Sequence, residues 1–370
     1  KMKNNLCFIT NIAPHYREPI FSLIDKEIGC DFYIGDHIHT KLKVFDYHIL
    51  SGYRKTLKNR FIGPFYWQQE SVQLVFKPYK YYILDGEPFC LSSWVILILC
   101  RLLGKKTIAW SHGWYGRESL LKGFIKKIFY KQFSMLMLYN RHAMRLMEGI
   151  GFDPKRMFCI ANSMDSDKEK AIRATLQPSN VYSSHFNNNL PTIIYCGRIQ
   201  KWKKLEMIID SMKMLKDAGR PVNAIFIGKD VEEVHLERYA EQYGLQANVW
   251  MYGPCYDDAI IGQMFYDAAV CVSPGNVGLT AIHSLSFGCP VITHNNFSFQ
   301  NPEFEAIIPG VTGDFFEKDN LQSMTDSIKK WTTKQPEERS KTREAAFKEI
   351  DDKWNIHYQI KVINKILQQE

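Results

Sequence analysis

Two groups of residues in the second half of this 370-residue sequence have the side-chain types and spacing needed to bind a diphosphate. Arg198 and Lys203 lie in a loop after a short apolar stretch, and a second loop, Ser273–Gly278, precedes a helical pattern that begins at Leu279. A guanidinium, an ammonium and the free N–H groups of a helix N-terminus together supply the donors and the charge that two phosphates need. A helix N-terminus alone contributes only about 0.3–1 kcal/mol to anion binding at an exposed site, so most of the binding free energy should come from the two cations. The alternatives are surface ion pairs and an ordinary connection between a strand and a helix.

The elements around these loops predict how the loops come together. The stretch Ala268–Thr293 has the pattern of a strand, a loop, a helix that Gly288 ends, and a second strand. Ile193–Cys196, which precedes Arg198, is also a short apolar strand. Because the carboxyl ends of parallel strands meet at one edge of a sheet, we expect both loops at the same edge.

The first half of the sequence repeats this arrangement with different side chains. Three predicted strands, Leu6–Thr10, Tyr81–Leu84 and Thr107–Trp110, are each followed by polar or charged residues. His112, after the third strand, is a candidate catalytic residue, although a single histidine is more often structural. The candidate acceptor-binding residues are His15, Tyr16, Arg17, Asp85 and Glu87. The alternative is that these side chains cap and pack the loops.

Strands and helices alternate along both halves, which predicts an α/β protein with two Rossmann-like, doubly wound domains facing across a cleft. We expect one domain at residues 1–165, which holds the candidate acceptor-binding residues, and a second at 192–345, which holds the diphosphate-binding candidates. Between them, residues 166–191 lose the periodic pattern and are expected to form a linker. Residues 346–370 are expected to form a C-terminal helix that packs back on the first domain. The first strand is not followed by G-x-G-x-x-G, so a dinucleotide clamp is not indicated.

Positive charge is concentrated in the first half of the chain. Residues 1–165 contain 24 Lys and Arg against 13 Asp and Glu, whereas the remainder contains 23 against 26. The stretch Leu121–Lys131 has the pattern of a basic amphipathic helix, which is compatible with reversible docking on an anionic membrane. The alternatives are a helix whose apolar face packs on the core, which is slightly favoured, and a solvated basic surface. We expect no nucleic-acid partner, because the basic half lacks a DNA- or RNA-binding motif.

Other features predict a cytoplasmic protein. Any membrane docking would then occur on the inner face of the membrane. The nine cysteines are scattered and form no CxxC pair, which indicates reduced thiols. The N-terminal residues show no signal-peptide pattern. The longest apolar run, Trp94–Cys100, is too short to span a bilayer of about 30 Å, so we expect a core helix there. The sequence shows no DxD at a strand end, no HExxH and no Cys/His cluster, so no metal site is expected.

Five motifs along the chain match the elements of a known family. Gly197-Arg198-Ile199-x-x-x-Lys203 matches G-R-[LI]-x-x-x-K-G, and Ser273-Pro274-x-x-x-Gly278-Leu279 matches a loop–helix element. The other three are Ile160–Asp165, which looks like a hinge motif, Glu305–Gly313 and Tyr16-Arg17-x-Pro19. In this order the motifs resemble those of retaining nucleotide-sugar glycosyltransferases of family 4, which have the GT-B fold. The resemblance covers nearly the whole chain.

The resemblance implies roles for the candidate residues. Arg198 and Lys203 would hold the donor diphosphate, and the backbone amides of Val277–Thr280 would contact the phosphate and the sugar of the donor. The loop that begins with Gly253 and Pro254 would lie beside the nucleobase, and His112 would face the transferred sugar. No metal ion or cofactor is implied, because the two cations stabilise the leaving diphosphate. The implied partners are a nucleoside-diphosphate sugar as donor and a glycan or lipid-linked acceptor.

The sequence departs from this family at two positions. Typical members carry two glutamates separated by seven residues, and the motif places Gly275 and His283 there. Asn276 would then bind the sugar and His283 the ribose. A subgroup of polysaccharide-assembly glycosyltransferases shares the form N-V-G-L-T-A-I-H. The full donor-binding set is Gly197, Gly253, Pro254, Asn276, Val277, Gly278, Leu279, Thr280, His283 and Glu305.

The resemblance thus implies transfer of a sugar with retention of configuration, in the biosynthesis of a surface polysaccharide. Two alternatives stay open. A nucleotide-sugar epimerase or hydrolase on the same fold would need acid/base carboxylates, for which Asp85, Glu87 and Glu305 are the candidates. A non-catalytic nucleotide-sugar-binding protein is suggested by the missing pair of glutamates.

Overall fold

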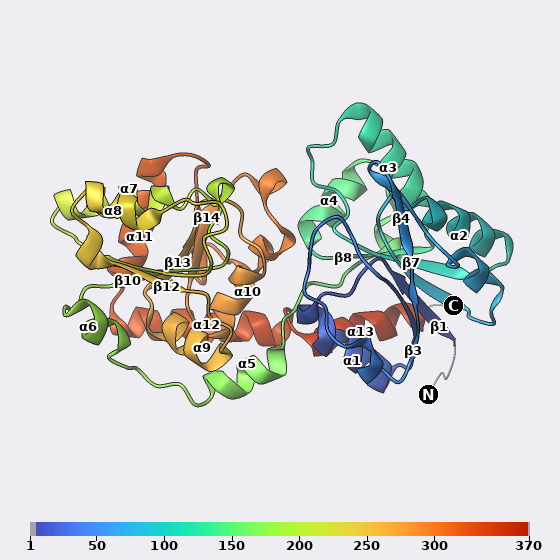
Figure 1. Ribbon diagram of the computed structural model, residues 1–370, viewed down its shortest axis with the longest axis horizontal. Helices are drawn as coiled ribbons and strands as arrows, with labels where there is room; N and C mark the ends of the chain where they lie inside the picture. Colours follow the sequence, from blue (N-terminus) through green and yellow to red (C-terminus); the bar gives the residue numbers. More distant parts are fainter. Residues whose placement is uncertain (1–4, 369–370) are drawn as a thin grey trace. The chain divides into compact units, whose positions relative to one another are not determined.

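The computed structural model describes residues 5–368, and these residues form two compact units (Figure 1). The first unit contains the described residues up to Asp165 together with those from Asn355 onwards, and the second contains Ser166–Trp354. Residues 1–4, where the sequence shows no signal-peptide pattern, lie outside the described residues. Each unit is built around its own parallel sheet.

The sheet of the first unit has seven strands in the order β3-β2-β1-β6-β7-β8-β9, and all neighbouring strands pair in parallel. The strands are β1 (Leu6–Thr10), β2 (Asp31–Gly35), β3 (Tyr53–Leu57), β6 (Tyr81–Asp85), β7 (Lys106–Ser111), β8 (Met135–Leu138) and β9 (Met157–Cys159). Apart from the edge strand β3, these strands are largely apolar, which suits a parallel sheet that is buried on both faces. The strand order reverses between β1 and β6, so the loops after these strands flank the topological switch point.

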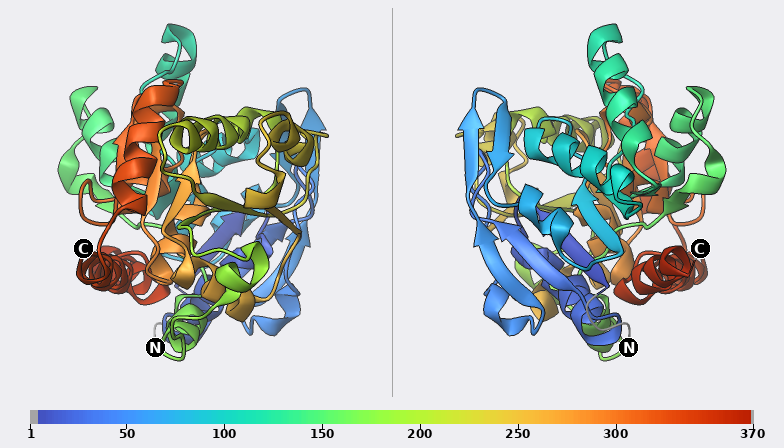
Figure 2. Two further views of the ribbon diagram at one scale, coloured as in Figure 1. Left: turned by 90° about the vertical axis from the view of Figure 1, so that its left-hand side faces the viewer. Right: turned by 90° about the vertical axis from the view of Figure 1, so that its right-hand side faces the viewer.

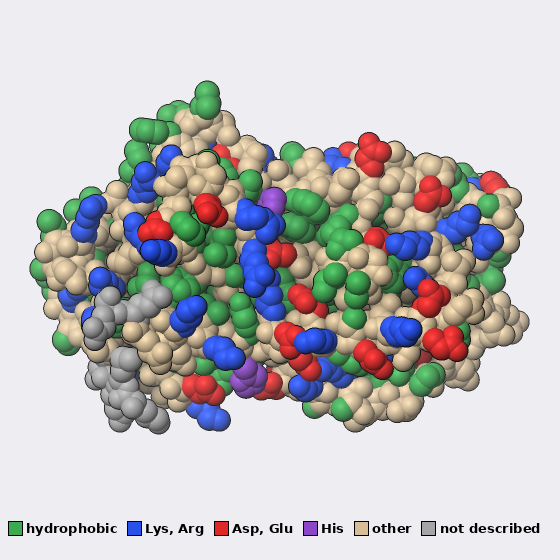
Figure 3. All heavy atoms as spheres, turned by 180° about the vertical axis from the view of Figure 1, so that it is seen from behind, with side chains coloured by type: hydrophobic (Ala, Val, Ile, Leu, Met, Phe, Trp, Pro, Cys, Tyr) green, Lys and Arg blue, Asp and Glu red, His purple; other side chains and the backbone are tan. Residues whose placement is uncertain are grey.

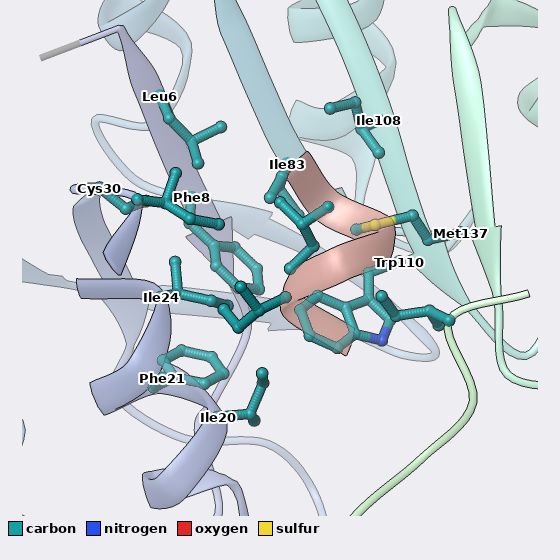
Figure 4. Close-up of a cluster of buried hydrophobic side chains, with 14 of the residues drawn as sticks. Leu6, Phe8, Ile20, Phe21, Ile24, Cys30, Ile83, Ile108, Trp110 and Met137 are labelled. Atoms are coloured by element: carbon teal, nitrogen blue, oxygen red, sulfur yellow. The ribbon is translucent and has the colours of Figure 1, made fainter. Parts of the chain in front are cut away.

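Helices cover both faces of this sheet. The helices are α1 (Glu18–Glu27), α2 (Leu91–Leu102), α3 (Leu120–Gln132), α4 (Arg141–Gly149) and α13 (Ile356–Leu367). On one face, α1 and α13 pack on a core in which the rings of Phe8 and Phe21 stack with centroids 5.0 Å apart (Figure 4). On the other face, Ile96, Phe129 and Met147 of α2, α3 and α4 share a second core.

The C-terminal helix α13 belongs to the first unit although it follows the second unit in the sequence. It lies beside α1 (Figure 1), and its isoleucines join the same core. Ser163 Oγ donates a hydrogen bond to Gln359 Oε1 at 2.7 Å. The expected boundary at residue 346 falls inside α12 (Pro336–Asp352), which stays in the second unit. The chain therefore changes unit only after Trp354.

The second unit has a six-stranded sheet in the order β12-β11-β10-β13-β14-β15, again with parallel pairing throughout. Its strands are β10 (Thr192–Cys196), β11 (Asn223–Ile227), β12 (Val249–Gly253), β13 (Val270–Ser273), β14 (Val291–His294) and β15 (Gly313–Phe316). Its further helices are α7 (Glu206–Asp217), α8 (Leu236–Gln242), α9 (Asp258–Asp267), α10 (Leu279–Ser286) and α11 (Leu321–Thr332). The switch point of this sheet lies between β10 and β13, and these strands carry the two loops with diphosphate-binding potential.

The expected linker, residues 166–191, is folded as part of the second unit. It forms α5 (Ser166–Arg173) and α6 (Val181–Phe186). Tyr182 Oη donates to Met264 O at 2.6 Å, and Glu169 is buried against α10. These anchoring residues are scattered among charged ones, so residues 166–191 lack a clear hydrophobic periodicity.

The predicted fold class is confirmed, because each unit is an α/β domain with a parallel, Rossmann-like sheet. Sequence reasoning missed β3 and the antiparallel hairpin of β4 (Asn59–Ile62) and β5 (Phe65–Gln68). These strands carry exposed and polar residues, so they lack the apolar run of a buried strand. Over residues 5–368, no helix combines the length and the hydropathy that crossing a bilayer requires.

Candidate functional site

The loops after β10 and β13, which flank the switch point of the second sheet, meet through Lys203 and Asn276. Lys203 ends the short helix η5 (Lys201–Lys203), and its Nζ donates to Asn276 Oδ1 at 2.9 Å and to Asn276 O at 3.1 Å. The Gly275 N–H donates to Lys203 O at 3.0 Å. The candidate diphosphate-binding lysine, which follows β10, therefore packs against the loop that leads into α10.

Lys203 is in an environment that disfavours its own charge. Desolvation and the nearby Arg198 guanidinium lower the pKa of Lys203 to about 8, and Glu303 opposes part of this effect. Lys203 Nζ also lies 4.1 Å from the centroid of the Trp202 ring. Arg198 is exposed, and its carbonyl oxygen accepts a hydrogen bond from Tyr195 Oη at 2.9 Å. Two neighbouring cations with little opposing charge form a site that a bound anion would stabilise.

Gly275 allows the two loops to approach this closely. A Cβ at this position would lie 2.8 Å from Trp202 O and 2.9 Å from Lys203 Cα, and both are backbone atoms. The glutamate that typical family 4 members carry here would collide with the loop after β10. The close backbone contact therefore requires a glycine at position 275.

The Val277 N–H, which we expected to contact the nucleotide-sugar donor, is already hydrogen-bonded within the protein. Val277 N donates to Gln300 Oε1 at 2.7 Å. Gln300 Nε2 in turn donates to Thr293 Oγ1 and to His294 O, each at 2.9 Å. The Gln300 side chain thus ties the loop after β13 to β14. Because the Val277 N–H is occupied by this bond, Val277 is removed from the predicted contacts with the nucleotide-sugar donor. Sequence reasoning missed Gln300, because no local pattern relates it to a loop more than twenty residues earlier.

The first turn of α10 keeps the other predicted amides. Gly278 is the residue before the helix, and the N–H groups of Leu279 and Thr280 lie in a turn where helix geometry provides no intrahelical acceptor. Thr280 Oγ1 donates to Cys196 O at 3.1 Å, which ties the start of α10 to the end of β10. The helix N-terminus and the two cations are thus held at the same edge of the sheet.

His283 lies in the interior of the second unit, with 8% of its surface exposed. Its ring packs between Phe265 and Phe287, at centroid distances of 5.3 and 5.5 Å. Its Nε2 lies 3.6 Å from Glu169 Oε1 of α5, and burial lowers the pKa of His283 to about 4, so the ring is neutral. The predicted contact of His283 with the ribose is therefore not supported, because the residue is on the buried face of α10.

The remaining donor candidates take different positions. Glu305 forms a largely buried ion pair with Lys353, with Oε1 and Nζ 3.1 Å apart. Gly253 ends β12 with φ of 85°, a left-handed conformation that favours glycine, and Pro254 follows it at the surface. Gly197 follows β10 at the switch point, directly before Arg198.

At the switch point of the first sheet, Asp85 orders the loop after β1. Its carboxylate accepts hydrogen bonds from Thr10 Oγ1 at 3.0 Å and from the Asn11 N–H at 2.5 Å. Burial raises the pKa of Asp85, while the Asn11 N–H and the charge of Arg17 oppose this shift. Asp85 therefore acts as an anchor for the loop that carries His15, Tyr16 and Arg17.

Arg17, Trp110 and His112 lie close together at this edge. The Arg17 guanidinium carbon is 4.3 Å from the centroid of the Trp110 ring. Arg17 Nη2 and Trp110 Nε1 are buried and make no hydrogen bond within residues 5–368. Buried donors cost free energy without a partner, so they mark a place for a ligand or for water. Desolvation and the charges of Arg17 and Lys126 lower the pKa of His112 to about 4, so its imidazole is neutral near pH 7.

The other acceptor candidates lie in the same two loops. His15 Nδ1 is 3.3 Å from Lys43 O, and the Tyr16 ring packs edge-on against His15 at 5.9 Å. Glu87 Oε1 accepts the Phe89 N–H at 3.2 Å, and desolvation and the neighbouring Asp85 raise the pKa of Glu87. The first sheet thus gathers its predicted residues at one edge, as the second sheet does.

Comparison with known proteins gives an independent view of both units. Residues 178–349 match the family model described as "Glycosyl transferases group 1". No curated protein sequence is similar to this chain. The structure is similar to HepE of Anabaena in complex with UDP, at 14% identity over 100% of both chains with a TM-score of 0.72. It is also similar to the lipopolysaccharide outer core galactosyltransferase WaaB, at 11% identity over 99% of both chains (TM-score 0.72), and to sucrose-phosphate synthase of Thermosynechococcus elongatus, at 13% over 99% of both chains (0.70).

These similarities cover both units in different ways. The family match spans Arg198, Lys203 and α10, the elements that meet at the switch point of the second sheet. The structural similarities extend over the full chain and establish a shared two-domain fold, the GT-B fold. Residues 178–349 are thus similar to the group 1 glycosyltransferase domain, whereas the similarity over the whole chain is one of fold.

Proposed function

We propose that this protein is a retaining glycosyltransferase that moves a sugar from a nucleoside-diphosphate sugar to a glycan or lipid-linked acceptor. The observation that carries the proposal is the meeting of Arg198, Lys203 and the first turn of α10 at one switch point, inside the group 1 match. We propose UDP as the nucleotide, since HepE is solved with UDP and with UDP-glucose.

The diphosphate would bind where the second unit lacks negative charge. Arg198 and Lys203 would each donate to phosphate oxygens, and a hydrogen bond to a charged group contributes about 1.5–3 kcal/mol. The Leu279 and Thr280 amides would add donors from the helix N-terminus. A bound diphosphate would also raise the lowered pKa of Lys203, because an opposite charge favours the ammonium form.

In the proposed reaction, the bond between the sugar C1 and the diphosphate oxygen breaks, and the acceptor oxygen bonds to C1 on the same face. The departing diphosphate oxygen takes the proton of the acceptor hydroxyl. The cations stabilise the charge that develops on the leaving group, and the first unit aligns the acceptor. His112, being neutral, would accept or donate a hydrogen bond to a hydroxyl of the transferred sugar.

The acceptor is proposed to bind at the edge of the first sheet, beside Arg17, Glu87 and Trp110. Two buried donors without a protein partner, Arg17 Nη2 and Trp110 Nε1, support this location. The proposed setting is the assembly of a surface polysaccharide at the cytoplasmic face of the membrane. WaaB, a structural neighbour, is described as a lipopolysaccharide outer core galactosyltransferase, which supports this class of acceptor.

The alternative of an epimerase or hydrolase is less well supported by the candidate carboxylates. Asp85 is held by Thr10 and Asn11, and Glu305 is paired with Lys353. An acid/base role would have to fall on Glu87, whose pKa is raised by desolvation.

Nucleotide binding and product analysis test the proposal together. A nucleotide present at 100 times its Kd should stabilise the protein by about 2.7 kcal/mol, and UDP should do so more than ADP or GDP at equal concentration. UDP-sugars are then incubated with and without a lipid or glycan acceptor fraction. A new glycoside formed only with acceptor, with its donor configuration retained by NMR, supports the proposal. Free sugar without acceptor would indicate a hydrolase, an interconverted nucleotide sugar an epimerase, and stabilisation without any product a binding protein.

A further inference from the structure

The α3 helix turns a row of apolar side chains to solvent. Leu120, Leu121 and Phe124 are 96%, 70% and 63% exposed, and Ile125 and Ile128 follow on the same side. The side of α3 that includes Phe129 and Tyr130 packs on the core of the first unit. The favoured expectation that the apolar face of this helix packs on the core holds for Phe129 but is wrong for Phe124, Ile125 and Ile128. In Figure 2 this teal helix stands out from the rest of the first unit.

The neighbouring helix α2 adds a second exposed apolar row. Its inner side is buried, as predicted for a core helix, but Leu91, Ile98 and Leu102 are exposed at helical spacing. The two helices pack against each other, with the rings of Trp94 and Phe129 5.0 Å apart. We call the exposed rows of α2 and α3 together the α2–α3 face. Figure 3 shows hydrophobic side chains projecting at the upper left, with Lys and Arg side chains close to them.

The charged residues on α2 and α3 themselves are all basic. Neither α2 nor α3 contains an acidic residue. Lys122 and Lys131 are exposed on α3, whereas Lys126 points back to Glu118 with an N···O distance of 2.7 Å. A cavity of about 270 Å³ lies at the carboxyl ends of both helices. Its cationic lining residues are Arg101, Lys105, Lys106, Lys131 and Arg156.

We propose that the α2–α3 face docks this protein on an anionic lipid bilayer, with the apolar rows in the acyl boundary and the basic cavity at the phosphate head groups. An amphipathic surface with exposed Leu and Phe beside Lys and Arg is the composition that binds such interfaces. A second copy of the chain fits less well, because two such faces would bring like charges together. The proposal does not depend on the proposed transferase activity.

Vesicle sedimentation with the full chain tests this proposal. We expect binding to vesicles of phosphatidylcholine mixed with phosphatidylglycerol, and at least about tenfold weaker binding to phosphatidylcholine alone or at high salt. The double variant Leu121→Ser/Phe124→Ser should lose binding to both vesicle types. The variant Lys122→Gln/Lys131→Gln should lose the preference for the anionic lipid.

Matched controls keep the outcome clear. Ile260→Ser and Lys329→Gln change an exposed apolar and an exposed basic residue on helices of the second unit, and both should bind vesicles like the wild type. Thermal unfolding and UDP binding of each variant show whether the fold and the donor site are intact. Equal binding to both lipids, or wild-type binding by Leu121→Ser/Phe124→Ser, would overturn the proposal. So would a dimer in light scattering that this double variant abolishes, because the face would then be a self-association surface.

Discussion

The two sheets have related topologies but carry different chemistry at their switch points. In the second unit, desolvation and the neighbouring Arg198 guanidinium lower the pKa of Lys203 to about 8. In the first unit, Arg17 is opposed by Asp85, and His112 is neutral. The carboxyl edge of the second sheet (the second edge) therefore carries positive charge that Glu303 offsets only in part, whereas that of the first sheet (the first edge) is largely balanced.

This difference indicates that two sheets of similar topology suit two different substrates of a transfer reaction. A cationic edge suits a diphosphate, whose charge satisfies both side chains. A balanced edge with buried, unpartnered donors such as Trp110 Nε1 suits a neutral acceptor rich in hydroxyl groups. The four predictions below test whether the two edges differ in this way.

The largest effect is expected from removing the cations of the second edge. Arg198→Ala or Lys203→Ala should lower kcat/KM by at least about tenfold, or about 1.4 kcal/mol of transition-state stabilisation, because the leaving diphosphate loses a charged donor. Arg238→Ala, which removes an exposed arginine on α8 of the same unit, should leave kcat/KM unchanged. Wild-type rates for both edge variants would remove the diphosphate assignment.

Gly275 permits the close approach of two loops in the second unit, and a larger residue there should disrupt it. Gly275→Ala places a Cβ against Trp202 O and Lys203 Cα, so we expect it to cost about 1–3 kcal/mol in the free energy of unfolding and to weaken UDP binding. Urea denaturation and calorimetry measure the two effects. Gly149→Ala at the end of α4, where a Cβ meets no atom within 4 Å, is the control and should not destabilise the protein. If both variants have equal stability, the tight loop contact is not present in solution.

A substitution at Asp85, on the first edge, should change both the free energy of unfolding and acceptor binding. Asp85→Asn replaces the charged carboxylate by a neutral amide with one acceptor oxygen, so the hydrogen bonds from the Thr10 hydroxyl and the Asn11 N–H should weaken. We expect a loss of about 1 kcal/mol in unfolding free energy and a raised KM for the acceptor. The Kd for UDP should not change, and a change in that constant would show that the two edges are not independent.

The smallest effect is a pH dependence that belongs to the second edge alone. As pH rises from about 7 to about 8.5, Lys203 loses its proton in the free protein and UDP affinity should fall about fourfold. Lys203→Arg keeps the charge, so it should flatten this dependence in calorimetric titrations. The stability contribution has the opposite sign: the folded pKa is below the unfolded value of 10.5, so it rises with pH between about 8 and 10.5. An unchanged slope in Lys203→Arg would assign the titration to another group.

The sequence predicted the central strands well because each is a local apolar run. Leu6–Thr10 and Thr192–Cys196 are buried strands of the two sheets, and their pattern depends on neighbouring residues only. Arg198 and Lys203 could also be found, since motif spacing and a preceding strand are local signals. The hairpin at Asn59–Gln68 and the helices of residues 166–191 were missed, because their anchoring contacts are few and separated by polar residues.

The sequence by itself determined which segments form strands and helices and which loops carry charge. Only the tertiary structure decided how each surface is used: Gln300 occupies the Val277 amide, His283 turns inward to Glu169, and the apolar row of α3 turns outward. Periodicity shows that a helix has two different faces. Which face meets a core depends on partners that are distant in the chain, and those partners are set only when the whole domain packs.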